Sequence, residues 1–210
     1  MAPTVEDFEA FNVGKETLWG AELEIAANPV SDLSLSLNYA LLIGRIDELN
    51  APAHTIFDPA VNPFSPYHVG QDISGLFDPS QGFAPRNSVN AAIDYVMTHF
   101  AHGDISTNLN YRWQGKREGS GSDVPGSEFA AAPAFGLLGA GATLHRNLVN
   151  GQRVTITLWG RNLLDSRAAA WVNGFGSIVP VSGTPAGYNG SVILGWQEPR
   201  RYGISATYEL

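Results

Sequence analysis

The sequence predicts an all-β fold: an antiparallel, up-and-down transmembrane β-barrel segment of about seven strands, which forms an open part of a larger barrel. Three observations support this prediction. Apolar and polar residues alternate with a period of two in seven segments, most of these segments are long, and short connections alternate with long ones. A membrane-spanning strand needs about 9–11 residues, whereas an average strand has about 5–6.

The segment 105–114 shows the alternation most clearly. Ile105, Leu109 and Tyr111 occupy odd positions, and Ser106 and Asn110 occupy even positions. A helix would mix the two sets on every face, whereas a strand separates them. The same split predicts strands at residues 11–27, 33–43, 88–97, 135–145, 153–158 and 201–210.

Pairing of neighbouring strands keeps residues of one face together. The convex face is therefore expected to carry an apolar set, namely Leu35, Leu37, Ile93, Tyr95, Leu109, Tyr111, Ile156, Leu158, Ile204 and Tyr208. The concave face is expected to carry a polar set, namely Ser36, Asn38, Asn90, Asp94, Asn108, Asn110, Arg112, Thr155, Thr157, Ser205 and Thr207. A lipid-facing set would stay accessible, whereas the inner face of a β-sandwich would be buried.

The connections are sorted by length. Short turns are predicted at residues 28–32, 101–104 and 146–152, and long loops at 47–86, 117–133 and 164–199. Barrels of the outer membrane have short periplasmic turns and long extracellular loops, so this order favours a membrane barrel over a soluble sandwich.

Composition excludes several classes of protein. The chain has 210 residues, no cysteine, and a formal charge of −8 from 20 acidic and 12 basic residues. The acidic balance and the scattered bases argue against a nucleic-acid partner. No stretch reaches 18 apolar residues, so a transmembrane helix is not expected. Residues 1–16 have no apolar run and include Glu6, Asp7 and Glu9, which is unlike a signal peptide.

The loop 47–86 contains the residues with the strongest potential for chemistry. His54, Asp58, His68 and Asp72 are types that ligate Zn²⁺, but their spacing matches no compact metal motif, so a solvated loop is favoured. The loop also holds five aromatic residues, for which packing within the loop is favoured over ligand contact: Phe57, Phe64, Tyr67, Phe77 and Phe83.

Three further patterns have a structural interpretation that is preferred to a catalytic one. Glu22 and Glu24 share a strand face, and charge balance in the lumen with Arg112, Arg153 and Arg161 is preferred to a glycosidase pair. The glycine-rich segment 119–123 lacks the lysine and the helix that a phosphate-binding loop needs. The Asn-Gly-Ser motif at 189–191 matches a glycosylation acceptor but is not interpreted as one in an outer-membrane protein. The sequence therefore predicts no catalytic, cofactor-binding or metal-binding residue.

Aromatic residues on the apolar faces lie near strand ends, where rings of a membrane barrel sit at the level of the lipid headgroups. The predicted girdle consists of Tyr39, Tyr95, Tyr111, Trp113, Tyr202 and Tyr208.

Several motifs occur in an order that resembles the C-terminal part of a TonB-dependent outer-membrane receptor. They are Gly20-Ala21-Glu22-Leu23-Glu24, Asn28-Pro29, Leu35-Ser36-Leu37-Asn38-Tyr39, Ala84-Pro85-Arg86-Asn87-Ser88, Asn162-Leu163-Leu164-Asp165 and Arg201-Tyr202-Gly203-Ile204. The resemblance covers residues 11–210. It implies a fragment of a 22-stranded barrel in the outer membrane of a Gram-negative bacterium, with residues 1–210 forming a partial barrel domain that lacks the plug domain and the signal peptide.

The resemblance also implies a function. The intact receptor would import a large scarce nutrient, such as a siderophore complex or cobalamin, and would not be an enzyme. Its partners would be outer-membrane lipid, the TonB system through the plug domain, and the nutrient at the extracellular loops, with no cofactor. Two alternatives remain: a soluble β-sandwich that binds carbohydrate or another ligand, and a small outer-membrane barrel with a structural or adhesive role.

Overall fold

The computed structural model describes residues 14–55, 57–77, 84–118, 131–181 and 184–210. Its main element is a seven-stranded sheet in the order β1-β2-β3-β4-β7-β8-β11, with every neighbouring pair antiparallel. The strands are β1 (Gly14–Val30), β2 (Leu33–Leu49), β3 (Asn87–Phe100), β4 (Gly103–Gln114), β7 (Phe135–Asn147), β8 (Arg153–Arg161) and β11 (Arg201–Glu209). The predicted seven strands and up-and-down order are confirmed.

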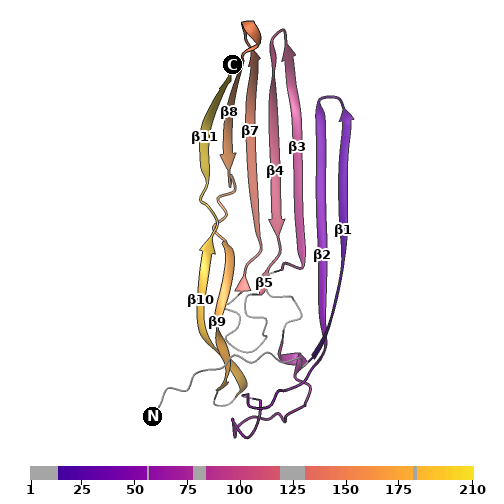
Figure 1. Cartoon of the computed structure of the whole chain (residues 1–210), viewed down its shortest axis with the longest axis vertical. Coiled ribbons are helices and arrows are strands. Elements are labelled where there is room, and N and C mark those ends of the chain that lie inside the picture. Colours follow the sequence, from indigo (N-terminus) through magenta and orange to yellow (C-terminus); the bar gives the residue numbers. More distant parts are fainter. Residues whose placement is uncertain (1–13, 56, 78–83, 119–130, 182–183) are drawn as a thin grey trace.

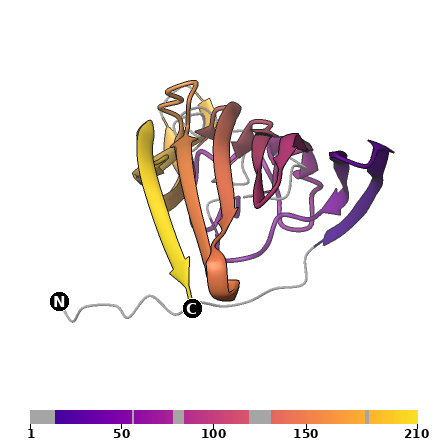
Figure 2. The same ribbon diagram turned by 90° about the horizontal axis from the view of Figure 1, so that it is seen from above.

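The sheet is curved and open. Figure 2 shows β11, in yellow, and β1, in indigo, at opposite ends of the curve. In the described ranges, β1 pairs only with β2 and β11 only with β8, so these two edges do not meet. The alternative of a small closed barrel is therefore wrong for this chain.

The connections are sorted as expected, with short turns at one end of the sheet and long segments at the other (Figure 1). The short end includes the 3₁₀ turn η3 (Val149–Gly151) between β7 and β8. The long segments contain the 3₁₀ turn η1 (Ser74–Leu76) and a small sheet of β5 (Arg117–Glu118) and β6 (Ala131–Ala132). In the described ranges, no helix is long and apolar enough to cross a membrane.

The third long segment differs from its prediction as a plain loop. It contains a hairpin of β9 (Ala169–Val181) and β10 (Thr184–Trp196), which forms a separate two-stranded sheet beyond the end of β8 and β11. Its sequence is rich in glycine and contains Pro180 and Pro185, which are signals for turns. The pairing of the two strands with each other overrides these local signals.

The register confirms that each predicted set shares one face. On the apolar side, Leu35 pairs with Ile93 and Ile93 with Leu109. On the polar side, Asn38 pairs with Asn90. The remaining members follow by the same pairing, since residues two apart on a strand point to the same side.

The apolar face is not enclosed by a second sheet. Leu158 is 53% exposed, Ile204 is 72% exposed and Ile93 is 42% exposed. Such exposed apolar side chains along a whole sheet are unlike the inner face of a sandwich. The soluble sandwich is therefore wrong. That this face is the convex one stays a prediction.

The buried apolar residues lie mostly outside the sheet. One cluster, in the segment between β2 and β3, contains Ala51, Phe57 and Ile73. A second, near the base of the β9–β10 hairpin, contains Ala132, Ala169 and Val172. The seven-stranded sheet, called the wall below, thus has two uncovered faces. The long connections contain small hydrophobic cores of their own.

Candidate functional site

The polar face of the wall is hollowed near the end where the long connections leave it. The hollow measures about 670 Å³ and is formed by β4, β7, β8, β11 and the segment that precedes β11. It is lined by Asn108, Asn110, Leu137, Leu138, Gly139, Ala140, Thr157, Trp159, Gly160, Arg161, Asn162, Gln197, Glu198, Pro199 and Ser205. A volume of this size is within the range of about 300–1,000 Å³ that is typical of small-molecule sites.

Glycines of β7 make the space. Gly139 and Gly141 lie on the polar face, between the asparagines of β4 and the large side chains of β8. The amide groups of Asn110 and Asn108 lean over them, because a Cβ added to Gly139 would be 2.6 Å from Asn110 Oδ1 and one added to Gly141 would be 2.3 Å from Asn108 Oδ1. Larger residues at these two positions would displace the asparagines and fill the floor of the hollow.

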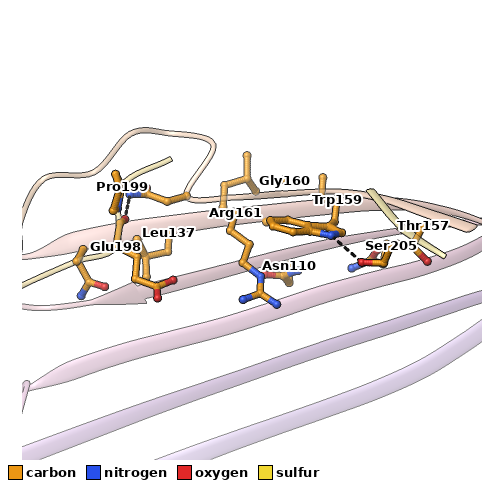
Figure 3. Close-up of a pocket in the computed structure, with 15 residues that line it drawn as sticks. Asn110, Leu137, Thr157, Trp159, Gly160, Arg161, Glu198, Pro199 and Ser205 are labelled. Carbon is orange, nitrogen blue, oxygen red and sulfur yellow. Dashed lines mark hydrogen bonds between the residues drawn. The ribbon is translucent and has the colours of Figure 1, made fainter. Parts of the chain in front are cut away.

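Trp159 lies on the polar face, an unusual place for an indole. Its Nε1–H donates a hydrogen bond to Ser205 Oγ at 3.1 Å. The guanidinium of Arg161 is 5.2 Å from the centre of the ring, within cation–π distance. Figure 3 shows the indole directed toward Ser205 and the side chain of Arg161 extending toward Asn110. These contacts hold the cation of Arg161 over the hollow.

The charges in the hollow do not cancel. Arg201 donates to the carboxylate of Glu198, so this pair is neutralised. Arg161 has no carboxylate within ion-pair distance among the residues that the structure describes. The hollow therefore contains a net positive group beside the neutral amide of Asn110.

Asn162 fixes the turn that closes the hollow at the end of β8. It is 7% exposed and has a positive φ of 50°, a conformation that asparagine tolerates well. Its Nδ2 donates to the backbone oxygens of Ser166 and Glu198, each at 2.9 Å, and its Oδ1 accepts from the Ser166 amide at 2.9 Å. The Asn-Leu-Leu-Asp motif of the sequence thus ties the start of the hairpin segment to its end.

The four metal-ligand candidates of the first long loop are not brought together. Asp58 accepts hydrogen bonds from the amides of His54 and Ala60, and Asp72 accepts one from the amide of Ser74. These carboxylates fix the loop backbone, as in Asx turns. In the described ranges, no group of three or more histidine, aspartate or glutamate side chains is arranged to hold a metal ion. His68 uses its backbone amide to bind Gln71 Oε1.

The carboxylates Asp58 and Asp72 have altered acidity. The hydrogen bond from the His54 amide, then that from the Ala60 amide, lowers the pKa of Asp58 below its ordinary value. The hydrogen bond from the Ser74 amide lowers the pKa of Asp72 in the same direction. Both side chains are therefore ionised acceptors that hold the loop at neutral pH.

The aromatic residues of this loop mostly pack on each other, as predicted. The ring of Phe57 contacts that of Tyr67 edge to face at 5.7 Å and that of Phe77 at 6.4 Å. Phe64 is different, since it is 87% exposed. Phe83 lies outside the described residues.

The predicted charge balance of the polar face is confirmed in placement but not in pairing. The register puts Glu24 in one row with Asn38, Asn90 and Arg112. Nη1 of Arg153 is 4.0 Å from Oε2 of Glu209, so Arg153 pairs with Glu209 rather than with Glu22 or Glu24. The two glutamates lie on the edge strand β1, five strands away from β8, which carries Arg161, and this distance prevents direct pairing.

The remaining sequence patterns add no site. The glycine-rich segment 119–123 lies outside the described residues, and the motif at 189–191 lies in β10. The register puts the predicted girdle on the apolar face, and Tyr202 and Tyr208 lie near the two ends of β11 at 67% and 54% exposed. Their position at the lipid headgroups stays a prediction. The sequence did not single out Trp159 or the hollow, because both depend on how four strands align.

Comparison with known proteins agrees with this geometry. The family model described as TonB dependent receptor-like, beta-barrel matches residues 2–163. The crystal structure of the ferric yersiniabactin uptake receptor FyuA from Yersinia pestis has a similar fold, with a TM-score of 0.57 and 17% identity. That similarity covers 93% of this chain and 24% of FyuA, so the chain spans about a quarter of that receptor. No curated protein matches the chain.

The match by the family model extends over more than half of the chain, and the open seven-stranded sheet corresponds to part of such a barrel. The family consists of transporters in the outer membrane of Gram-negative bacteria, and its members are not enzymes. The chain belongs to the TonB-dependent receptor β-barrel family.

Proposed function

We propose that residues 1–210 form a partial barrel domain of a receptor that imports a large scarce nutrient across the outer membrane, driven by TonB. The observation that carries the proposal is the difference between the two faces of one sheet. An exposed apolar face suits lipid, and a face of asparagine, serine, threonine and arginine suits a wet lumen.

The long connections are the proposed point of first contact with the nutrient. They gather at one end of the wall, and in this family the long loops are extracellular. The nutrient class is a siderophore complex or cobalamin, and FyuA, by its description a ferric yersiniabactin uptake receptor, favours the siderophore complex. The partners are outer-membrane lipid, the nutrient, and TonB through a plug domain; nucleic acid is not one of them.

The proposal is tested by uptake of radiolabelled nutrient into cells that make the receptor containing this chain. Ferric siderophores and cobalamin are supplied separately, to cells with and without TonB. We expect accumulation of one ferric siderophore only in cells with TonB and with the receptor. Import that is equal without TonB, or no import of any of these compounds, would contradict the proposed function.

A further inference from the structure

We propose that the hollow around Arg161 is a subsite for a carboxylate group of the transported compound. The proposal rests on the proposed function, since it specifies a chemical group of the nutrient that the polar face of the wall would bind. It commits to an anionic, carboxylate-bearing ligand rather than to a neutral one.

The first argument is charge. Arg161 lies over the hollow without a carboxylate partner among the described residues, while the neighbouring Arg201 is paired with Glu198. A guanidinium matches a carboxylate with two parallel hydrogen bonds, and such charge-assisted bonds are about twice as strong as neutral ones. The pairing of Arg201 leaves Arg161 as the cation that an anion would meet.

The second argument is preorganisation. Arg161 is stacked on Trp159, and the indole is held in turn by its hydrogen bond to Ser205. A long arginine side chain that is already confined loses less entropy when it binds. The indole covers one flat face of the Arg161 guanidinium. The N–H groups at the edge of the guanidinium therefore stay available to a ligand.

The third argument is space and a neutral second donor. The glycines at 139 and 141 leave room above β7, and the side chain of Arg161 extends toward Asn110 across that room (Figure 3). A carboxylate between them would accept from the guanidinium and from the Asn110 amide. The volume of about 670 Å³ accommodates a larger part of the compound around that carboxylate.

Citrate is the probe for this subsite, and trimethyl citrate, which has the same skeleton without the three charges, is the matched neutral compound. The receptor containing this chain is purified in detergent with ¹⁵N-labelled tryptophan. The indole N–H signal of Trp159 is assigned by its loss in Trp159→Phe. We expect citrate to shift this signal in a saturable manner and trimethyl citrate to leave it unchanged.

The variants separate a subsite from a general effect of charge. Arg161→Gln is expected to weaken citrate binding about tenfold or more, and Arg161→Lys to retain part of the affinity because it keeps the charge but loses the paired hydrogen bonds. Arg153→Gln is the control, since Arg153 lies on the same strand and face at the other end, beside Glu209. It is expected to bind citrate like the unaltered receptor.

The proposal is overturned if citrate and its trimethyl ester shift the signal equally, if Arg161→Gln binds as well as Arg153→Gln, or if citrate leaves the signal in place. The last result would mean that another part of the receptor fills the hollow. Binding is measured here without TonB, so failure of the subsite is distinct from failure of TonB-driven import in the uptake experiment.

Discussion

Trp159 and Gly203 are direct neighbours across β8 and β11, and the indole lies over the bare backbone of the glycine. A Cβ at position 203 would be 2.3 Å from Cζ2 of the ring, far inside contact distance. Gly203 belongs to the Arg-Tyr-Gly-Ile motif of the last strand. Its role in this structure is to leave room for a large side chain on the lumen face.

Gly203→Ala is therefore expected to push the Trp159 indole out of place and to break its hydrogen bond with Ser205. Overpacking of this kind costs about 1–3 kcal/mol of folding free energy. Denaturation in urea, followed with the indole N–H signal, measures both effects. Gly75→Ala is the control, because no atom lies within 4 Å of the Cβ it would add. Equal stability of the two variants would show that the ring is not held there.

Leu37→Arg is expected to impair insertion of the receptor into lipid vesicles, whereas Asn38→Arg is tolerated. Leu37 lies on the apolar face, opposite Ile25 and Ala91, and an arginine near the membrane centre costs about 2–4 kcal/mol. Asn38 lies opposite Glu24 on the polar face, where a new cation meets water and a carboxylate. Equal losses of folding yield for both variants would mean that the faces are assigned wrongly.

Asn162→Ala and Asn162→Gly are both expected to loosen the segment that carries the β9–β10 hairpin. Both remove the three side-chain hydrogen bonds to Ser166 and Glu198, and a typical hydrogen bond contributes about 0.5–1.5 kcal/mol to stability. The alanine variant should be the less stable of the two, since only glycine accepts the positive φ at position 162 without strain.

Limited proteolysis within residues 164–199 measures this loosening. The matched control is Asp165→Asn, which also sits at a positive φ of 53° but loses only an exposed ion pair with Arg167. If cleavage is as slow in the two Asn162 variants as in this control, the side-chain hydrogen bonds of Asn162 do not hold the hairpin.

The compact segment between β2 and β3 is expected to loosen in acid. The pKa values of Asp58 and Asp72 are lowered in the folded loop, so their contribution to stability is complete above the ordinary pKa of about 3.9 and is lost as pH falls through the lower folded values. Hydrogen exchange of the His54 and Ala60 amides, which donate to Asp58, follows the change.

Asp58→Asn removes one of these ionisable groups and should flatten the acid dependence of exchange at His54 and Ala60. Asp72 is unchanged in this variant and keeps the acid dependence at the Ser74 amide. The same acid profile at His54 with and without the substitution would contradict the role given to Asp58.

The isolated chain of 210 residues is not expected to form a stable monomer in detergent. The outer edges of β1 and β11 have no partner strand among the described residues, and unpaired backbone groups are unfavourable in hydrocarbon and promote aggregation. Light scattering and electrophoresis without heating test this. A monodisperse species that resists heat would require the two edges to pair.

The faces of the wall are predictable from sequence because they follow from local alternation. Leu109 and Asn110 are adjacent in the chain, and a strand alone places them on opposite sides. The β9–β10 hairpin is not predicted because its glycines and prolines resemble those of a loop. Its strands are stabilised by pairing with each other and by the contact of Ala169 and Val172 with Ala132, which the local sequence does not reveal. The hollow was missed for a similar reason: it arises where Gly139 from one strand, Asn110 from a second and Arg161 from a third are aligned.

The segment that packs Phe57, Ile73 and Ala51 together has a consequence for how such receptors diversify. Its fold is secured by its own aromatic contacts and Asx turns, and its contact with the sheet is made through the end of β2. A segment of this kind can be exchanged for another between the ends of β2 and β3 while the register of the wall stays the same. The residues exposed to a ligand, such as Phe64, can then change while the strands of the barrel stay the same.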